Sequence, residues 1–251
     1  MTDLTGKTAL ITGSARGIGK AIALRYAKLG ANIVLNYSAN AANGEQALKE
    51  VRELGGQAIA VQADISKAAD VDRLFAAATE QFGSVDIVVA NAGLELLGTP
   101  IADLSDEQID RMVDVNARGT LLTLQRAAKN VADQGRIIYV ASTAIANPVA
   151  GAGLYTATKA PGRYFAEVLA RETAERRITV NTIQPGPIDE AGVFIDSIPT
   201  DSPFRGIQAA GRIEDRIGTP SDVADAAEYL VGDLATWVSG TTIAVTGGLP
   251  Q

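Results

Sequence analysis

Short apolar segments alternate with longer amphipathic segments along most of the chain. Glycine and polar residues bound the apolar segments, as is typical of strands that are buried on both faces of a parallel sheet. Between them, apolar residues recur at the spacing of helices that pack by one face. This order predicts an α/β fold with a doubly wound parallel sheet, helices on both faces, and ligands outside the carboxyl ends of the strands. The predicted strands are residues 7–12, 31–35, 58–63, 85–90, 136–141 and 178–183.

Capping residues mark where several predicted helices begin. A serine or threonine before an amphipathic segment supplies a side-chain oxygen that accepts from the first helical amides. We expect N-caps at Ser66, at Ser105 with Gln108 completing a capping box, and at Thr219, which Pro220 follows.

The length and composition favour one domain. The chain has 251 residues, 47% of them hydrophobic, so we expect residues 1–251 to share one core. Residues 187–215 interrupt the alternation, and so long an irregular stretch is usually functional. The net charge of −7 argues against nucleic acid or anionic membranes as partners. Residues 1–6 do not resemble a secretion signal and no apolar run reaches the ~20 residues of a membrane span, so we expect a cytoplasmic protein.

The absence of cysteine and histidine narrows the chemistry that the chain can perform. It excludes disulfides, thiolate nucleophiles and cysteine metal sites, and we expect no metal. A general acid or base must therefore be another residue, and Tyr155 with Lys159 is the best candidate. Their i, i+4 spacing puts both side chains on one face of a helix. The ammonium is expected to lower the pKa of the phenol from ~10, so that Tyr155 can exchange a proton with a substrate.

A glycine-rich turn follows the first predicted strand. Gly13, Gly17 and Gly19 lie between this strand and a helix expected over residues 18–29, with Gly30 at its C-terminus. Such a turn is an anion site, because unpaired backbone amides and the helix dipole face the ligand. Glycine also lets the backbone approach a pyrophosphate without an intervening Cβ. The turn therefore predicts a dinucleotide site.

Gly13-x3-Gly17-Ile18-Gly19 and Tyr155-x3-Lys159 together resemble the compact branch of the short-chain dehydrogenase/reductase family. The resemblance covers nearly the whole chain and implies one Rossmann-type sheet of about seven strands. It also implies that residues 187–215 are a substrate-binding lid. Further matching residues are Asp64, Asn91-Ala92-Gly93, Asn116, Ser142 and Pro185-Gly186.

The resemblance implies an oxidoreductase that reversibly reduces a ketone or aldehyde to an alcohol. Tyr155 would donate the proton and Ser142 would hold the carbonyl. Lys159 would bind the nicotinamide ribose and lower the Tyr155 pKa, and Asn116 would position a water that links Lys159 to solvent. The implied cofactor-binding residues are Gly13, Ser14, Arg16, Gly17, Ile18, Gly19, Asn36, Tyr37, Ser38, Asp64, Ile65, Asn91, Ala92, Gly93, Tyr155, Lys159, Pro185, Gly186 and Ile188.

The end of the second predicted strand favours NADP(H) over NAD(H), although NAD(H) stays possible. NAD enzymes commonly carry a carboxylate there to hold the ribose 2′-hydroxyl. Here the strand leads into Asn36-Tyr37-Ser38, which lacks one. A 2′-phosphate would tolerate Asn36 and gain hydrogen bonds from Ser38 or Asn40. Arg16 would add a charge-assisted contact.

Three residues depart from the family pattern. Glu190 stands where the family usually has a threonine that contacts the nicotinamide amide, so we expect backbone at Ile188 to make this contact. Pro161 lies inside the predicted catalytic helix, where a proline removes a hydrogen bond and crowds the carbonyl of Ala157. Thr246 replaces an aspartate of the last strand.

The substrate pocket is expected to be mostly apolar, which suits a carbonyl compound with a hydrophobic substituent. One alternative is a β-ketoacyl carrier-protein reductase, with Arg171, Arg176 and Arg177 beginning a docking patch. A sugar dehydrogenase is less compatible with apolar walls, and a non-catalytic dinucleotide-binding sensor is an alternative of another class. The resemblance implies a homotetramer, to which residues 235–238 and Gln251 would contribute, although core packing would equally explain Trp237. The expected substrate-binding residues are Ser142, Ala144, Val149, Leu154, Tyr155, Pro187 and Phe194.

Overall fold

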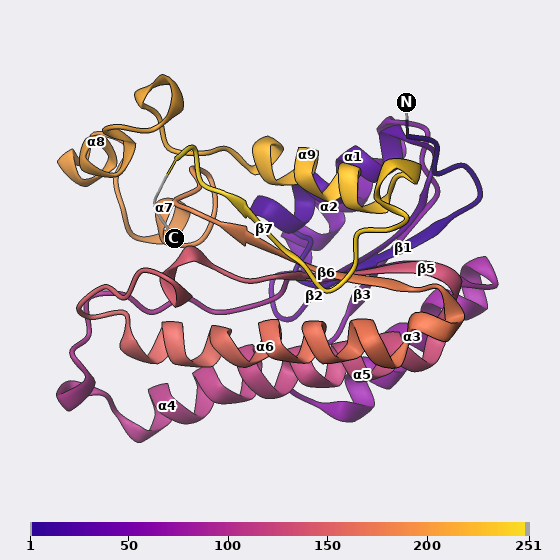
Figure 1. The fold of residues 1–251 in the computed structure, drawn as a ribbon, viewed down its shortest axis with the longest axis horizontal. Coiled ribbons are helices and arrows are strands. Elements are labelled where there is room, and N and C mark those ends of the chain that lie inside the picture. Colours follow the sequence, from indigo (N-terminus) through magenta and orange to yellow (C-terminus); the bar gives the residue numbers. More distant parts are fainter. Residues whose placement is uncertain (1, 249–251) are drawn as a thin grey trace.

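The computed structural model describes residues 2–248, which form one seven-stranded parallel sheet with helices around it (Figure 1). The strand order is β3-β2-β1-β4-β5-β6-β7, so the winding direction reverses between β1 and β4. In such sheets this reversal opens a crevice for ligands at the carboxyl ends of the strands. The predicted doubly wound fold is confirmed. The strands are β1 Thr8–Ile11, β2 Asn32–Tyr37, β3 Ala58–Gln62, β4 Val85–Ala90, β5 Val131–Val140, β6 Thr179–Pro185 and β7 Thr242–Val245.

The helices form a layer on each face of the sheet (Figure 1). Side chains of α1, α2 and α9 pack in one core cluster, and side chains of α3, α5 and α6 pack in the other. The helices of the first layer are α1 Gly17–Lys28, α2 Ala41–Glu53 and α9 Pro220–Val231. Those of the second are α3 Ala68–Phe82, α4 Asp106–Met112, α5 Thr120–Asn130 and α6 Gly153–Glu172, with a π-helical segment, Val113–Gly119, joining α4 to α5.

The central strands bury apolar side chains on both faces, which explains their uninterrupted apolar sequences. In β1, Ala9 and Ile11 belong to the core cluster under α1 and α9, while Leu10 belongs to the cluster under α3 and α6. All three side chains are fully buried. Each fully buried aliphatic side chain stabilises the fold by roughly 1.5–3 kcal/mol, so the sheet itself anchors the strand ends that form the cleft.

Two of the three predicted helix starts are confirmed and one is wrong. Ser105 and Gln108 form a capping box at α4, and Thr219 forms one with Asp222 at α9. Ser66 is not the N-cap of α3, which begins one residue later with Lys67 in the capping position. The Ser66 hydroxyl donates instead to Asp64 at 2.7 Å, because this carboxylate competes for it within the same turn.

Pro161 lies in the middle of α6, and the helix continues through it. Proline removes the amide that the carbonyl of Ala157 would accept from. Ala157 is exposed, so water can hydrogen-bond its carbonyl in place of that amide. The departure from the family pattern is therefore tolerated on the solvent side of the helix.

Residues 187–215 are ordered by local contacts and contain two short helices, α7 Val193–Asp196 and α8 Pro203–Ala209. Arg205 connects them, since its guanidinium donates to the carbonyl oxygens of Phe194 and Ile198 at 2.8 and 2.9 Å and pairs with Asp189. In Figure 1 both helices lie beyond the carboxyl ends of the strands. The segment is thus a folded cover beside the ligand crevice.

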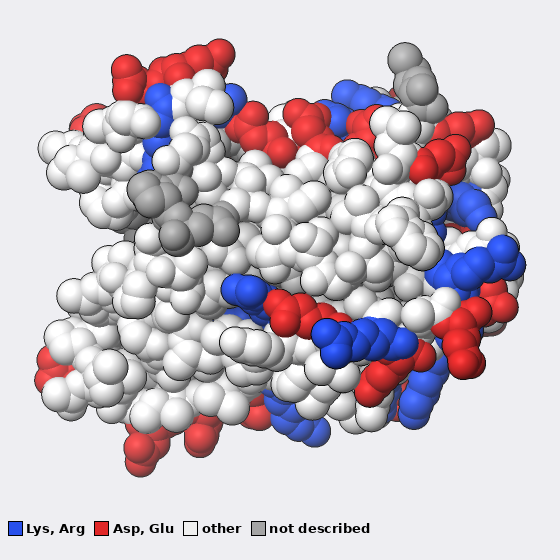
Figure 2. Space-filling model, in the orientation of Figure 1, with Lys and Arg blue, Asp and Glu red and all other residues white. Residues whose placement is uncertain are grey.

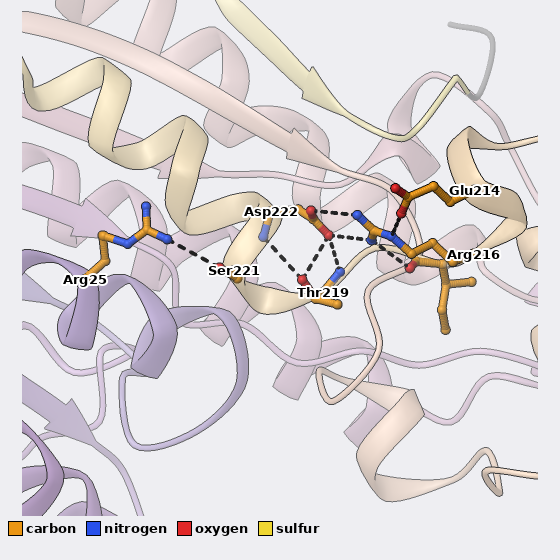
Figure 3. Close-up of polar contacts among 7 residues, drawn as sticks. Arg25, Glu214, Arg216, Thr219, Ser221 and Asp222 are labelled. Carbon is orange, nitrogen blue, oxygen red and sulfur yellow. Dashed lines mark hydrogen bonds and ion pairs between the residues drawn. The ribbon is translucent and has the colours of Figure 1, made fainter.

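The end of this segment is tied to α9 by the network in Figure 3. Arg216 pairs with Asp222 at 2.7 Å and with Glu214 at 2.9 Å. Asp222 also accepts from the amide of Thr219 at 2.6 Å. These hydrogen bonds, with that of Arg216 first, lower the pKa of Asp222 to about 2.

This low pKa predicts acid-sensitive stability. A carboxyl whose pKa falls from ~3.9 on folding contributes fully above pH ~4, and the contribution is lost as the pH falls toward 2. We expect Asp222→Asn to lower the free energy of unfolding by about 1 kcal/mol at pH 7, and by progressively less below pH 4. Urea unfolding of the wild type and of Asp222→Asn across this pH range measures the difference between their free energies of unfolding. A difference that does not change with pH would contradict the prediction.

Candidate active site

A cleft of about 570 Å³ opens at the carboxyl ends of the strands, where the winding direction reverses. Its walls come from the glycine-rich turn, the ends of β2 and β3, the segment after β4, the start of α6 and the segment that contains α7. Segments far apart in the sequence therefore meet around one site, as the sequence predicts for the strand ends.

The glycine-rich turn approaches its neighbours so closely that larger residues would not fit. Gly13 and Gly17 have φ of +63° and +55°, which L side chains rarely adopt. A Cβ at Gly13 would lie 2.8 Å from the Cα of Ala92, and a Cβ at Gly19 would lie 2.6 Å from both the Asn91 amide nitrogen and the Gly13 carbonyl. Gly13 and Gly17 line the cleft, whereas Gly19 packs behind the turn.

Asn91 links this turn to the end of β4. Its side-chain amide donates to the carbonyl oxygens of Thr12 and Gly13 at 2.9 and 3.1 Å. The Thr12 hydroxyl accepts from the backbone amides of Asn91 and Ala92 at 3.0 and 3.1 Å. Two strand ends are thereby fixed to each other, so the sequence Asn91-Ala92-Gly93 shapes the floor of the cleft.

Asn36 and Ser14 differ from the expectation that both contact a cofactor directly. Asn36 is 2% exposed, and its side chain accepts from the Gly13 amide at 3.1 Å and donates to the Ala63 carbonyl at 3.0 Å. The Ser14 hydroxyl is fully buried, donates to the Ile11 carbonyl and accepts from the Asn36 amide. Both polar side chains are consumed in holding the turn, which leaves Tyr37 and Ser38 open to a ligand.

Asp64, at the far end of the cleft, carries a stabilised negative charge. Burial acts to raise its pKa, but hydrogen bonds from Ser66 and the charge of Arg111 outweigh burial and lower the pKa. Arg111 lies 3.6 Å from the Asp64 carboxylate and lines the cleft with it and Ile65. Arg111 lies on α4 with no motif around it, so nothing in the sequence marks it as a residue of the cleft.

Tyr155 and Ser142 both line the opposite end of the cleft. Tyr155 is in the first turn of α6, and Ser142 follows β5. Burial raises the pKa of Tyr155, the charge of Glu95 raises it further, and the nearby Ser142 hydroxyl lowers it. The expected lowering by Lys159 is therefore wrong, because burial dominates.

Lys159 is buried one turn after Tyr155, and its ammonium donates to the Val140 carbonyl at 3.0 Å. The same group lies 5.6 Å from the ring centre of Tyr139. Burial lowers the pKa of Lys159 to about 8, against the charge of Glu95. A Cβ on Gly93 would lie 2.9 Å from the ammonium, so a side chain there would displace the end of Lys159.

Asn116 is fully buried in the π-helical segment that joins α4 to α5. Such segments are frequent at functional sites. Its side chain accepts from the Leu94 amide at 2.7 Å and donates to the Leu94 carbonyl at 2.9 Å and to the Thr158 hydroxyl at 3.0 Å. The side chain thus positions the wall of the cleft that follows Gly93.

The end of β6 and the segment that follows it form another wall of the cleft. The residues that line it there are Pro185, Gly186, Pro187 and Ile188. The Pro187 carbonyl and the Asp189 amide both form hydrogen bonds with the backbone of Gly218. Because successive amides of an extended chain point to opposite sides, the Ile188 amide between them points away from Gly218. Glu190 has a φ of +53°, a costly backbone conformation for a residue with a side chain. Thr246 is bound by Arg212 through its carbonyl, at 3.1 Å.

Two carboxylates of the cleft carried no sequence signal. Glu95 accepts from the Val193 amide at 2.9 Å, and Asp196 accepts from both terminal nitrogens of Arg16 at 2.6 Å. They hold the two ends of α7 to opposite walls of the cleft. Arg16, expected to bind a cofactor phosphate, is thus paired with α7 in this structure.

The expected substrate-binding residues separate into two groups. Ser142, Tyr155, Pro187 and Phe194 line the cleft together. Ala144, Val149 and Leu154 are not among the lining residues. Val149 is exposed, since the stretch before α6 turns outward to solvent.

The residues of the turn fit a dinucleotide. Gly13 and Gly93 stand where a Cβ would meet neighbouring atoms, and backbone amides at the start of α1 face the cleft as an anion site requires. Within residues 2–248, no three acidic side chains are grouped to hold a metal ion. No helix in this range is long and apolar enough to cross a membrane. The fold and the cleft define a dinucleotide-binding protein.

Comparisons with known proteins identify the family. A family model described as enoyl-(acyl carrier protein) reductase matches residues 13–250. An uncharacterized oxidoreductase of Methylorubrum extorquens is 36% identical over 249 residues, covering 99% of this chain and 100% of its own. The 3β-hydroxysteroid dehydrogenase 1 of Eggerthella lenta is 39% identical over 253 residues, with 98% and 95% coverage. The structure of the angucycline C-6 ketoreductase LanV with bound NADP has a TM-score of 0.90, 33% identity, and 98% and 96% coverage. The chain belongs to the short-chain dehydrogenase/reductase family of oxidoreductases.

Proposed function

We propose that the protein is an NADP(H)-dependent reductase that converts a ketone or aldehyde to an alcohol. The observation that carries this proposal is that Tyr155, Ser142 and Lys159 line the same cleft as the glycine-rich turn. The ketoreductase LanV, bound to NADP, has the same fold. When bound, the nicotinamide supplies a hydride for the carbonyl carbon.

The residues of the cleft divide the remaining work. Ser142 would donate a hydrogen bond to the carbonyl oxygen and orient it toward Tyr155. The Tyr155 hydroxyl would give its proton to that oxygen as the C–H bond forms, which yields the alcohol. A raised Tyr155 pKa suits this direction, because the hydroxyl stays protonated at neutral pH. Lys159 would stabilise the resulting phenolate, and the Asn116 region would connect it to solvent for the proton to be replaced.

Loss of NADPH absorbance against a panel of carbonyl compounds tests this function. The panel holds an aryl ketone, an aliphatic ketone, an aldehyde, a β-keto ester and a β-ketoacyl thioester. Turnover of the ketones supports the proposal, and turnover of the thioester alone would favour the carrier-protein reductase. NADPH binding without any turnover would favour a sensor.

One contact weighs against the carrier-protein alternative. Arg176, expected within a docking patch, pairs with Asp133 at 2.8 Å and donates to the carbonyls of Ala128 and Val131. These bonds hold the segment after α6 to the junction of α5 and β5. The guanidinium is therefore engaged in the fold and is less available to an acidic partner.

The choice of NADP(H) rests on Arg16 and on Tyr37 and Ser38, which line the cleft at the end of β2. Because Asp196 neutralises Arg16, we expect Asp196→Asn to raise the affinity for NADPH about 2- to 5-fold and to leave that for NADH nearly unchanged. Fluorescence titration with NADPH and with NADH measures the ratio of the two affinities in each variant. Asp189→Asn, which removes an equal charge from the same segment, serves as the control. An unchanged ratio in Asp196→Asn would contradict the role of Arg16.

A homotetramer stays a prediction by family resemblance. Leu234 and Trp237 are 88% and 98% exposed, so core packing does not explain Trp237. Figure 2 shows a largely uncharged surface over β7, next to this segment. Large exposed apolar side chains on such a surface are typical of an interface between subunits. Gln251, expected at the same interface, lies outside the described residues.

A further inference from the structure

Glu95 places a carboxylate in the cleft, and the proposed mechanism gives it no role. It lines the cleft with Ser142 and Tyr155. One carboxylate oxygen, Oε2, accepts from the Val193 amide at 2.9 Å. In the described part of the chain, no lysine or arginine lies within ion-pair distance of Glu95, and the other oxygen, Oε1, has no hydrogen-bond partner.

The backbone beside Glu95 is held firmly. The preceding residue, Leu94, is bound through both its amide and its carbonyl by the buried side chain of Asn116. On the other side, the backbone of Gly192 packs against the carboxylate so closely that a Cβ there would overlap it. The carboxylate therefore has a defined position, although the residue is exposed at the cleft.

Its charge acts on the reacting groups. Protein atoms around Glu95 raise its own pKa by desolvation, although the side chain is open to the cleft. The same charge raises the pKa of Tyr155, and it acts to raise the pKa of Lys159 against the effect of burial. The free oxygen, Oε1, can accept a hydrogen bond from a ligand that enters the cleft.

We propose that Glu95 is a specificity-determining residue that accepts a hydrogen bond from a substrate hydroxyl. The substrate class is then a hydroxylated ketone with an apolar body, which Leu94, Pro187 and Phe194 would contact. This inference rests on the proposed ketone reduction. A site built to bind a hydroxyl discriminates strongly against the analogue that lacks it, since the acceptor is left unpaired.

The test compares acetophenone with its α-hydroxy, meta-hydroxy and para-hydroxy derivatives, with NADPH. Glutamine keeps the size of Glu95, and its oxygen would accept the hydrogen bond from the Val193 amide. Its NH₂ group would then face the substrate hydroxyl, and because this group is a donor it cannot accept the hydroxyl's hydrogen bond. We expect Glu95→Gln to lower kcat/KM about 10- to 100-fold for at least one hydroxylated ketone and less than about 3-fold for acetophenone. Glu95→Leu should show the same selective loss.

Asp196→Asn is the matched control. It releases α7 at its other end and leaves the Glu95 carboxylate in place, so all four ketones should change in equal proportion. Melting temperature and NADPH affinity establish that each variant is folded. A loss of equal size on all four ketones in both Glu95 variants would reduce Glu95 to an anchor of α7 and overturn the inference. Absence of turnover by the wild type with any ketone would overturn the proposed function as well.

Discussion

Tyr155→Phe is expected to lower the rate of carbonyl reduction by about 10²- to 10⁴-fold, while the protein still folds and binds NADPH. The substitution removes only the phenol hydroxyl, in the cleft that Ser142 also lines. Without it, the proposed proton donor beside Ser142 is missing. Single-turnover rates with saturating NADPH measure the chemical step directly.

Tyr139→Phe is the matched control for this experiment. Tyr139 is also buried, but its hydroxyl donates to the Lys159 carbonyl at 2.8 Å and does not line the cleft. Its loss should cost about 1 kcal/mol of stability and change the rate only slightly. If Tyr155→Phe kept the rate within tenfold of the wild type, another residue would have to be the acid.

The sequence was sufficient for the parts of the fold that depend on local patterns. Apolar segments such as β1 are buried on both faces, and the spacing of Tyr155 and Lys159 places both on one face of α6. Glycine spacing likewise indicated the turn, because glycine adopts the φ observed at Gly13 and Gly17 without the strain that a side chain would add. These features need only neighbouring residues to be recognised.

What the sequence did not reveal depends on contacts between distant segments. Arg16 and Asp196 are 180 positions apart, and neither belongs to a motif that would pair them. Asn36 lies near the end of a strand, where a ribose-binding residue would lie. Its side chain is instead hydrogen-bonded to Gly13 and Ala63, which approach it only in the folded protein. Glu95 lies in an apolar segment outside the helices, and the backbone of this segment is positioned by a hydrogen bond from Leu94 to the side chain of Asn116.

The same close packing makes the glycine-rich turn sensitive to a single side chain. Gly19→Val is expected to weaken NADPH binding at least about 100-fold, because the new Cβ would lie 2.6 Å from the Gly13 carbonyl and from the Asn91 amide, and overpacking costs roughly 1–3 kcal/mol or more. Calorimetric titration measures the affinity, and the melting temperature shows how much of the protein is folded. Gly206→Val makes the same change in α8, where a Cβ meets nothing within 4 Å, and should bind NADPH like the wild type. Folded Gly19→Val protein with unaltered affinity would show that the dinucleotide binds elsewhere than at this turn.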